Sequence, residues 1–417
     1  MSLSNTSIFL LNDGSVMGCG DSSNYQLGTT STSTVSIPKK IDIENVVHFS
    51  TSLNHVMFLL KDGKIFGRGN NDIGQIGSGN TDTAINDTRA VNVENCRRIH
   101  TSAKNTIFLL NDGTVMGCGD NSKCQLGIKT GSYYTTPKLI SGLTKVKDIT
   151  GGYEYSMFLL NDETVKACGN NNNGQLGLGD TANRNTPTLI PDLNNVHQIS
   201  CGYYHVMFLL NDGTVKACGY NGFGQLGFGD TTNRNTPTLI PELNDVKQIS
   251  CGNNYVLFLL NDGTVKVCGR NGNGQLGLGN KTDINVPTLI PNLNNVRQIS
   301  CGYNHTLFLL KDGTVKSCGA NSNGQLGLGN TTDRVVPTLI PNLNNVKNIE
   351  FPLNWIIYCM RKNGTDFIYK NDARIELNSI ENLYEFGIKS CDEICKQYLE
   401  KEKDNDIKIK KLIKEEE

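Results

Sequence analysis

Residues 237–279 read PTLIPELNDVKQISCGNNYVLFLLNDGTVKVCGRNGNGQLGLG, and they contain one complete unit of a repeat. Residues 237–240 form a short apolar segment that begins with proline, where a strand best tolerates a missing N–H. Residues 246–251 alternate apolar and polar side chains, as in a half-buried strand. Residues 256–260 are a continuous apolar run, and residues 264–268 return after an Asp-Gly turn that we expect to be type I′. One unit is therefore predicted to be a four-stranded antiparallel meander.

The Phe-Leu-Leu of the apolar run recurs along the chain at a nearly constant interval, 49 residues once and 50 residues five times. The seven copies begin at Phe9, Phe58, Phe108, Phe158, Phe208, Phe258 and Phe308. Units of about 50 residues with four strands are typical of β-propeller blades, and an open solenoid is the alternative. The seven copies predict a closed ring of seven blades.

The two ends of the repeat region are incomplete, which predicts how the ring closes. The first copy begins at residues 6–9 without its first two strands, whereas residues 337–349 supply two strands with no good hairpin after them. Two plus two strands make a blade, so we expect residues 7–19 to complete the closing blade and residues 38–319 to form six continuous blades. Residues 354–370 compete for that place as a decayed eighth hairpin.

The chain thus divides into three predicted parts. Residues 1–350 form an all-β, seven-bladed propeller whose ring is closed by shared N- and C-terminal strands. Residues 351–370 form a degenerate hairpin, and residues 371–417 form a charged tail whose apolar residues have near-helical spacing. A short coiled-coil contact is the alternative interpretation of this helical tail.

A second signature, Gly-Gln-Leu-Gly, follows the fourth strand of the unit. Its glycines permit tight backbone paths, and the glutamine amide can satisfy backbone groups that a loop leaves unpaired. The glutamine recurs seven times, which suits seven equivalent packing sites, so we expect a structural role. The glutamines are Gln26, Gln75, Gln125, Gln175, Gln225, Gln275 and Gln325.

One copy departs from the turn pattern, because Glu163 stands where the other copies have glycine. A left-handed backbone at this glutamate is expected to cost about 1 kcal/mol.

The motifs of one copy resemble a known family. Tyr-Tyr-His at residues 203–205, Phe208-Leu-Leu, Asn-Asp-Gly213 and Gly-Gln-Leu-Gly at residues 224–227 resemble the regulator of chromosome condensation repeat. The resemblance covers roughly residues 7–350 and implies a seven-bladed propeller.

The composition limits which binding partners and which cellular compartment we expect for the protein. Lys and Arg number 39 and Asp and Glu 40, so no global field attracts nucleic acid or an anionic membrane. The chain shows neither 18 consecutive apolar residues nor a secretory signal pattern. Two cysteine positions recur with the repeat on strands about 10 Å apart, too far for a disulfide. We therefore expect reduced cysteines and a monomer in the cytoplasm, with no membrane or nucleic-acid partner.

The sequence offers no enzyme motif. No Gly-x-Ser-x-Gly, Walker loop or His-Glu-x-x-His segment occurs, and no cysteines have zinc-ligand spacing. His55, His205 and His305 share one repeat position, and the resemblance implies packing there rather than metal binding. We predict no catalytic residue, no metal site and no cofactor.

Function is expected where the copies differ, in two sets of loops. Tyrosine and exposed phenylalanine provide a large contact area at low entropic cost. Packing of these tyrosines against neighbouring blades is the alternative. Arg184, Arg234 and Arg334 are expected to be solvated. The candidate partner-binding residues are Tyr153, Tyr155, Tyr203, Tyr204, Tyr220, Phe223 and Tyr303.

The resulting prediction is a non-catalytic scaffold that binds another protein through one propeller face. The resemblance also implies two alternatives, nucleotide exchange on a Ran-type GTPase and substrate recognition for a ubiquitin ligase. Exchange in the family depends on a wedge that projects from one blade, and the constant interval between Phe58 and Phe308 leaves no room for a wedge there.

Overall fold

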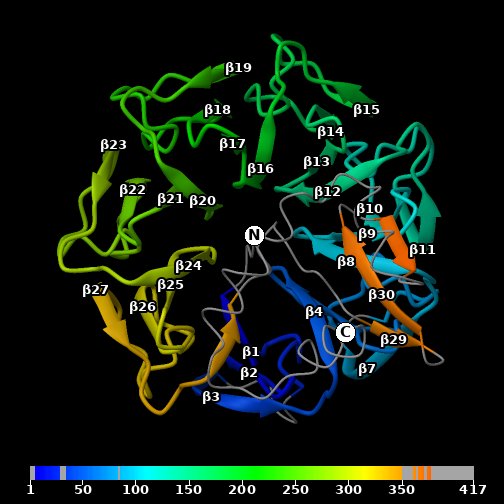
Figure 1. The fold of residues 1–417 in the computed structure, drawn as a ribbon, viewed down its shortest axis with the longest axis horizontal. Helices are drawn as coiled ribbons and strands as arrows, with labels where there is room; N and C mark the ends of the chain where they lie inside the picture. Colours follow the sequence, from blue (N-terminus) through cyan, green and yellow to red (C-terminus); the bar gives the residue numbers. More distant parts are fainter. Residues whose placement is uncertain are drawn as a thin grey trace, which may run out of the picture. The chain divides into compact units, whose positions relative to one another are not determined.

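The computed structural model describes residues 5–28, 34–82, 85–349, 360–362, 365–370 and 373–376. The chain divides into two compact units, Met1–Leu353 and Asn354–Glu417. The described part of the first unit contains strands β1 to β28, which form seven four-stranded antiparallel sheets. These sheets are the blades of a β-propeller, with one strand of each blade near the central axis and the last at the periphery (Figure 1).

Blades 1 to 3 follow the N-terminal strands β1 to β3 in the chain. The strands of each blade are named from the innermost one outward. Blade 1 consists of β4 (Val46–Thr51), β5 (His55–Leu60), β6 (Ile65–Gly69) and β7 (Ile85–Val91). Blade 2 consists of β8 (Cys96–Thr101), β9 (Asn105–Leu110), β10 (Val115–Asp120) and β11 (Tyr133–Leu139). Blade 3 consists of β12 (Val146–Gly151), β13 (Tyr155–Leu160), β14 (Val165–Gly169) and β15 (Arg184–Leu189).

The remaining blades complete the ring. Blade 4 consists of β16 (Val196–Cys201), β17 (His205–Leu210), β18 (Val215–Gly219) and β19 (Arg234–Leu239). Blade 5 consists of β20 (Val246–Cys251), β21 (Tyr255–Leu260), β22 (Val265–Gly269) and β23 (Ile284–Leu289). Blade 6 consists of β24 (Val296–Cys301), β25 (His305–Leu310), β26 (Val315–Gly319) and β27 (Arg334–Leu339). Blade 7 consists of β28 (Val346–Asn348), β1 (Thr6–Leu11), β2 (Val16–Gly20) and β3 (Val35–Ile41).

The predicted order of strands within a unit was wrong by one strand. The Pro-Thr-Leu segment does not open a blade but forms the outermost strand of the preceding one, since β19 pairs with β18. The closing blade therefore joins one C-terminal strand, β28, to three N-terminal strands rather than two to two. Residues 7–19 lie in this blade, as expected, and the six continuous blades run from Val46 to Leu339.

The hydrophobic core lies between successive blades. Phe208 and Val206 of blade 4 pack with Met157, Leu159 and Leu176 of blade 3 in one buried cluster. The second strand of each blade is covered on both faces, which explains its continuous apolar run. Each blade thus needs its neighbours to bury its apolar side chains.

The hairpin turn between the second and third strands is not type I′. In blade 5 the Gly263 N–H donates to the Leu260 carbonyl, and the Leu260 N–H donates to the Thr264 carbonyl. Gly263 has a φ of 85°, whereas Asp262 does not have a positive φ. This is a three-residue loop that ends in a left-handed residue, where glycine is favoured.

Glu163 occupies the left-handed position of the same turn in blade 3, with a φ of 66°, as expected. Replacing it with glycine should raise the free energy of unfolding by about 0.5 to 1 kcal/mol, because the backbone strain disappears. The exposed bond from Asn211 Nδ2 to the Glu163 carboxylate, 2.7 Å long, would be lost and offsets little of this gain. Urea unfolding of Glu163→Gly measures the effect, and Gly213→Glu in blade 4 should give the opposite sign.

The second unit contains a three-stranded antiparallel sheet of β29 (Met360–Lys362), β30 (Thr365–Lys370) and β31 (Ala373–Glu376). The described residues of the predicted hairpin, 360–362 and 365–370, thus pair with each other and with β31. Residues 373–376, expected in the helical tail, are a strand, and residues 377–417 of that tail lie outside the described residues.

The cysteines of the described part of the chain are free, and nearly all of them are buried. Cys201 and Cys218 lie on strands separated by β17, since each pairs with Val206. Across the described ranges, no helix is long and apolar enough to cross a lipid bilayer.

Candidate functional site

The two variable loop sets lie at the same end of the propeller. One set joins the first and second strands of each blade, and the other joins the third and fourth, so antiparallel pairing brings both to one end. In blade 4 the Tyr220 N–H donates to the Tyr204 carbonyl at 2.8 Å, which ties the two sets together. We call this end the loop face and the opposite end, which carries the Asn-Asp-Gly hairpins, the turn face.

A glycine at the end of the third strand permits this close approach. Gly219 has a φ of 104°, and a Cβ at this position would lie 2.4 Å from the Tyr204 carbonyl oxygen. No side chain fits there without moving the backbone.

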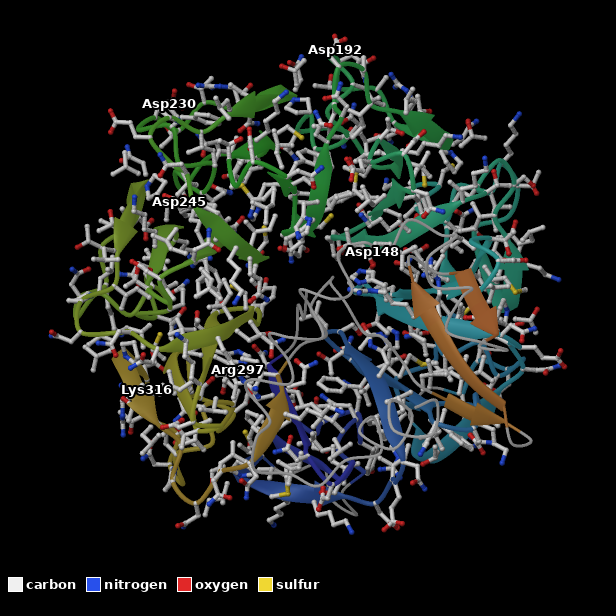
Figure 2. All side chains as sticks on the ribbon, viewed as in Figure 1. Asp148, Asp192, Asp230, Asp245, Arg297 and Lys316 are labelled. Atoms are coloured by element: carbon white, nitrogen blue, oxygen red, sulfur yellow. The ribbon has the colours of Figure 1, made fainter. Side chains whose placement is uncertain are left out.

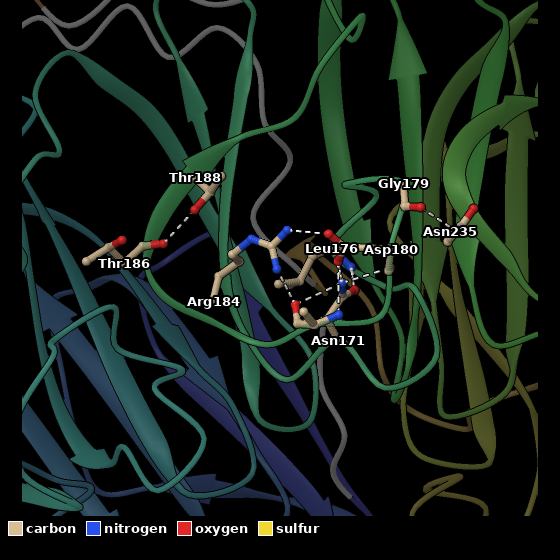
Figure 3. Close-up of polar contacts among 9 residues, drawn as sticks. Asn171, Leu176, Gly179, Asp180, Arg184, Thr186, Thr188 and Asn235 are labelled. Atoms are coloured by element: carbon tan, nitrogen blue, oxygen red, sulfur yellow. Dashed lines mark hydrogen bonds and ion pairs between the residues drawn. The ribbon is translucent and has the colours of Figure 1, made fainter.

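A buried asparagine organises the loop that carries the recurrent glutamine in six of the seven blades, and Figure 3 shows the loop of blade 3. In blade 3 the Asn171 Oδ1 accepts the Leu176 N–H at 2.8 Å. Its Nδ2 donates to the carbonyls of Asp180 and Ala182 at 3.0 and 3.2 Å. The sequence prediction missed this residue, although its recurrence at 50-residue spacing was visible. The equivalent asparagines are Asn71, Asn121, Asn221, Asn271 and Asn321.

The glutamines of this loop also bond to the backbone. In blade 3 the Gln175 Oε1 accepts the Asn173 N–H at 2.9 Å. The Gln175 carbonyl accepts the Cys218 Sγ–H of the next blade at 3.6 Å. The same side-chain bond occurs at Gln26, Gln75, Gln125, Gln225, Gln275 and Gln325.

The recurrent arginines are held at the blade edge rather than simply solvated. Arg184 Nη2 lies 2.6 Å from Asp180 Oδ2, and Arg234 Nη2 lies 2.7 Å from Asp230 Oδ2. Arg334 donates to the Thr332 carbonyl at 3.2 Å.

Four of the predicted partner-binding tyrosines form one cluster on the loop face. Tyr153 and Tyr203 stack with ring centroids 4.3 Å apart and planes 9° apart. Tyr204 stands at 85° to Tyr203 and at 87° to Tyr153, with centroids 4.6 and 5.9 Å away. Tyr303 meets Tyr203 edge-on at 6.4 Å. All four side chains are half-buried, so each ring packs against its neighbours and keeps exposed surface.

Backbone hydrogen bonds between blades hold this tyrosine cluster. The Tyr153 N–H donates to the Tyr203 carbonyl at 3.1 Å, and the Tyr203 N–H donates to the Asn253 carbonyl at 3.0 Å. The Asn253 N–H continues the series to Tyr303 at 3.2 Å. Burial and then the neighbouring Tyr153 and Tyr204 raise the pKa of Tyr203, so its hydroxyl stays protonated at neutral pH.

Tyr220 and Phe223 form a second aromatic pair on the loop face, with ring centroids 6.3 Å apart and planes at 76°. The Arg270 Cζ lies 5.2 Å from the centre of the Phe223 ring, which is a cation–π geometry. The structure therefore shows two aromatic groups on one face.

Tyr155 is the exception among the predicted contacts. It is fully buried, and its hydroxyl donates to the carbonyls of Gly202 and His205 in the next blade at 2.9 and 2.7 Å. Burial raises its pKa well above the usual value. Tyr155 belongs to the core and is not a partner contact.

The histidines that share this repeat position also bridge blades. His55 Nε2 lies 3.0 Å from Thr106 Oγ1, and His305 Nε2 lies 2.9 Å from Ser7 Oγ. Val256 replaces the hydroxyl residue opposite His205, and neither ring nitrogen of His205 has a hydrogen-bond partner.

The innermost strands of blades 1 to 3 carry charged or titratable groups. Arg98 Nε lies 2.8 Å from the buried carboxylate of Asp148, which faces the centre of the ring (Figure 2). His48 Nε2 lies 2.8 Å from the Ile99 carbonyl, and His100 Nε2 lies 3.2 Å from that of Gly151. These side chains bridge neighbouring blades. Within the described ranges, no group of three His, Cys, Asp or Glu side chains could hold a metal ion.

Family models match most of the propeller. The regulator of chromosome condensation (RCC1) repeat matches residues 13–59, 112–159 and 163–209, and a second model of this repeat matches residues 146–175. The RCC1-like domain matches residues 193–354. Among curated proteins, none matches the chain.

Solved structures share the fold. Prp20p from Saccharomyces cerevisiae is 21% identical with a TM-score of 0.72, over 80% of this chain and 88% of that chain. A chain in the structure of Kap60 bound to yeast RCC1 (Prp20) is 20% identical with a TM-score of 0.70, over 82% and 85% of the two chains. Human WBSCR16 is 21% identical with a TM-score of 0.68, over 80% and 93%. The matching repeats and the seven blades show that this chain belongs to the regulator of chromosome condensation repeat family.

Proposed function

We propose that this protein is a non-catalytic scaffold that binds another protein through its loop face. The observation that carries the proposal is the cluster of four half-buried tyrosines, Tyr153, Tyr203, Tyr204 and Tyr303. Tyrosine and arginine are frequent among the residues that dominate the binding energy of protein interfaces, and phenylalanine is enriched there. The Tyr220–Phe223–Arg270 group lies on the same face.

The composition around these aromatic groups supports the proposal. The loops are rich in asparagine and glycine. Asparagines such as Asn172, Asn254 and Asn304 carry no charge and can form hydrogen bonds with a partner. Tyrosine combined with asparagine, serine and glycine is also the composition of antibody loops. A reducing compartment suits the free, buried cysteines.

Partner capture with matched variants tests the proposal. The loop-face variant combines Tyr203→Ala, Tyr204→Ala and Phe223→Ala, and the control combines Asn161→Ala, Asn211→Ala and Asn261→Ala on the exposed turn face. We expect the wild type and the control to retain a stoichiometric protein from native extract, and the loop-face variant to retain at least about tenfold less. Circular dichroism and thermal unfolding verify that both variants fold. Equal capture by the two variants would contradict the assignment of the loop face.

Nucleotide exchange is the competing function. Prp20p, which shares the fold, is described with its binding to Gsp1p and histones. Release of labelled GDP from a Ran-type GTPase provides the test, and we expect this protein to leave the rate unchanged. A strong acceleration would replace the scaffold proposal.

A further inference from the structure

The half-buried aromatic side chains of the loop face differ in one respect, since only some of them have an arginine of the same chain over the ring. Arg270 Cζ lies 5.2 Å from the centre of the Phe223 ring, and Arg234 Cζ lies 5.0 Å from that of Phe228. Among the described residues, these are the arginines or lysines placed over aromatic rings. Within the described ranges, no arginine or lysine lies over a ring of the tyrosine cluster.

Tyr204 stands nearly perpendicular to the stacked pair of the cluster, and we call the place where these three rings meet the corner. Tyr153 and Tyr203 stack 9° from parallel, and Tyr204 stands at 87° and 85° to them. Two perpendicular π faces can contact one cation from two sides, as in the aromatic cages that bind quaternary ammonium groups. Backbone bonds between blades 3, 4 and 5 hold the loops that carry Tyr153 and Tyr203, so little ordering of these loops is required on binding.

A carboxylate adjoins the same corner. Glu154 directly follows Tyr153, and its negative charge contributes to the raised pKa of Tyr204, after the larger effect of burial. Asn170 Nδ2 donates to Glu154 Oε2 at 3.0 Å and orients the side chain. Glu154 also has a left-handed φ of 65°, a conformation that is costly for glutamate. The loop thus holds an acidic group beside the tyrosine rings at a cost in backbone strain.

We propose that the corner formed by Tyr153, Tyr203, Tyr204 and Glu154 binds a cationic side chain of the partner protein, either an arginine guanidinium or a methylated lysine ammonium. The inference rests on the proposed function and specifies the chemistry of the partner. Both cations are weakly hydrated and favour aromatic faces, whereas an unmodified ammonium is strongly hydrated. The Glu154 carboxylate supplies the complementary charge, and it disfavours an acidic partner residue.

Small cations test the corner without knowledge of the partner. Choline is titrated against its neutral isostere 3,3-dimethylbutan-1-ol at constant ionic strength, and methylguanidinium forms a separate arm. The readout is NMR of selectively labelled tyrosine rings. We expect choline or methylguanidinium to shift the signals of Tyr153, Tyr203 and Tyr204 saturably, and the neutral isostere to bind at least about three times more weakly. The stronger of the two cations identifies whether the partner supplies a methylated lysine or an arginine.

Two substitutions provide the matched pair. Glu154→Gln should weaken binding of the cation about three- to fivefold, whereas Glu163→Gln, the same change on the turn face of the same blade, should leave it unchanged. Tyr204→Phe keeps the π face and should retain binding, and Tyr204→Leu should lose it, so a folding defect in one variant does not decide the result. Equal binding of the neutral isostere, or equal effects of the two glutamate variants, would overturn the inference.

The two proposals fail in different ways. If the cations do not bind but the loop-face variant still loses its partner, the inference is wrong and the scaffold function stands. If the cations bind but the loop-face variant captures the partner normally, the corner exists and the assignment of the scaffold face is wrong.

Discussion

When the pH falls from 7 to 5, we expect the propeller to lose most of its free energy of unfolding, because its buried histidines are held neutral. Burial lowers the pKa of His55 and His205 to about 3 and that of His305 to about 4. Burial, followed by the positive charge of Arg98, lowers the pKa of His48 to about 3.

The sign of the effect follows from proton uptake. Each folded-state pKa lies below the ordinary value of 6.5, so the unfolded chain binds more protons between the two values. Stability is complete above pH 6.5 and is lost as the pH falls from there toward 3. At pH 5 one such histidine costs about 2 kcal/mol, and the four together cost about 8 kcal/mol. The total stability of a domain is about 5 to 15 kcal/mol, so the four groups decide the outcome.

The carboxylate of Asp262 titrates at a lower pH than the histidines affect, so its effect on stability can be separated from theirs. Hydrogen bonds from the backbone and side chain of Thr264 lower the pKa of Asp262 in the exposed hairpin turn. Stability from this carboxylate is present above its ordinary pKa of 3.8 and is lost only below it. Urea unfolding at intervals from pH 8 to pH 5 measures the histidine effect before Asp262 titrates. A free energy of unfolding that stays constant down to pH 5 would contradict the prediction.

The repeat itself suggests substitutions that test the role of the histidines, because one copy has tyrosine at their position. Tyr155 occupies the repeat position of His205 and donates to the carbonyls of Gly202 and His205. His205→Tyr should therefore fit, with its hydroxyl directed to the equivalent carbonyls of blade 5, and should remove one titrating group. We expect the acid midpoint to fall by about 0.4 pH unit, since about four protons drive the transition. Tyr155→His should raise the midpoint.

The fold was predictable because a fixed interval requires identical units, but the strand order within a unit was not. A repeat in a closed ring has no intrinsic start, and the outermost strand β19 lies between two candidate partners. Its connection to β20 is short and its connection to β18 is long, so the sequence favours pairing with β20. The structure reverses this, because Asn221 folds the long loop onto itself through Leu226 and Asp230, and the short connection crosses between blades.

The candidate site was predictable to a similar extent. The variable loops identified the tyrosines, and antiparallel strand direction accounts for their common face. Tyr153 and Tyr155 could not be distinguished, because the boundary between loop and strand falls between them. The alternation of Tyr155 with His205 and His305 was the available indication of burial, since a repeat position that bridges blades must be buried in every copy.

Replacing Asn171 with aspartate is expected to lower the free energy of unfolding by about 3 to 5 kcal/mol at pH 7. The Asn171 Nδ2 donates to two carbonyls in a fully buried site, and a carboxylate oxygen there would face them without a proton. The Asp180 carboxylate, which Nδ2 also contacts at 3.2 Å, adds repulsion between like charges. Urea unfolding measures the change.

Asn172→Asp is the matched control, since it makes the same charge change at the adjacent exposed residue and should alter stability by less than about 0.5 kcal/mol. Equal effects of the two substitutions would show that Asn171 does not organise the loop. The consequence for the loop face is specific, because Asn170, which orients Glu154, immediately precedes Asn171. Asn171→Asp should therefore weaken choline binding at the tyrosine corner, and Asn321→Asp in blade 6, which disturbs an equivalent loop away from Glu154, should destabilise the fold and leave that binding intact.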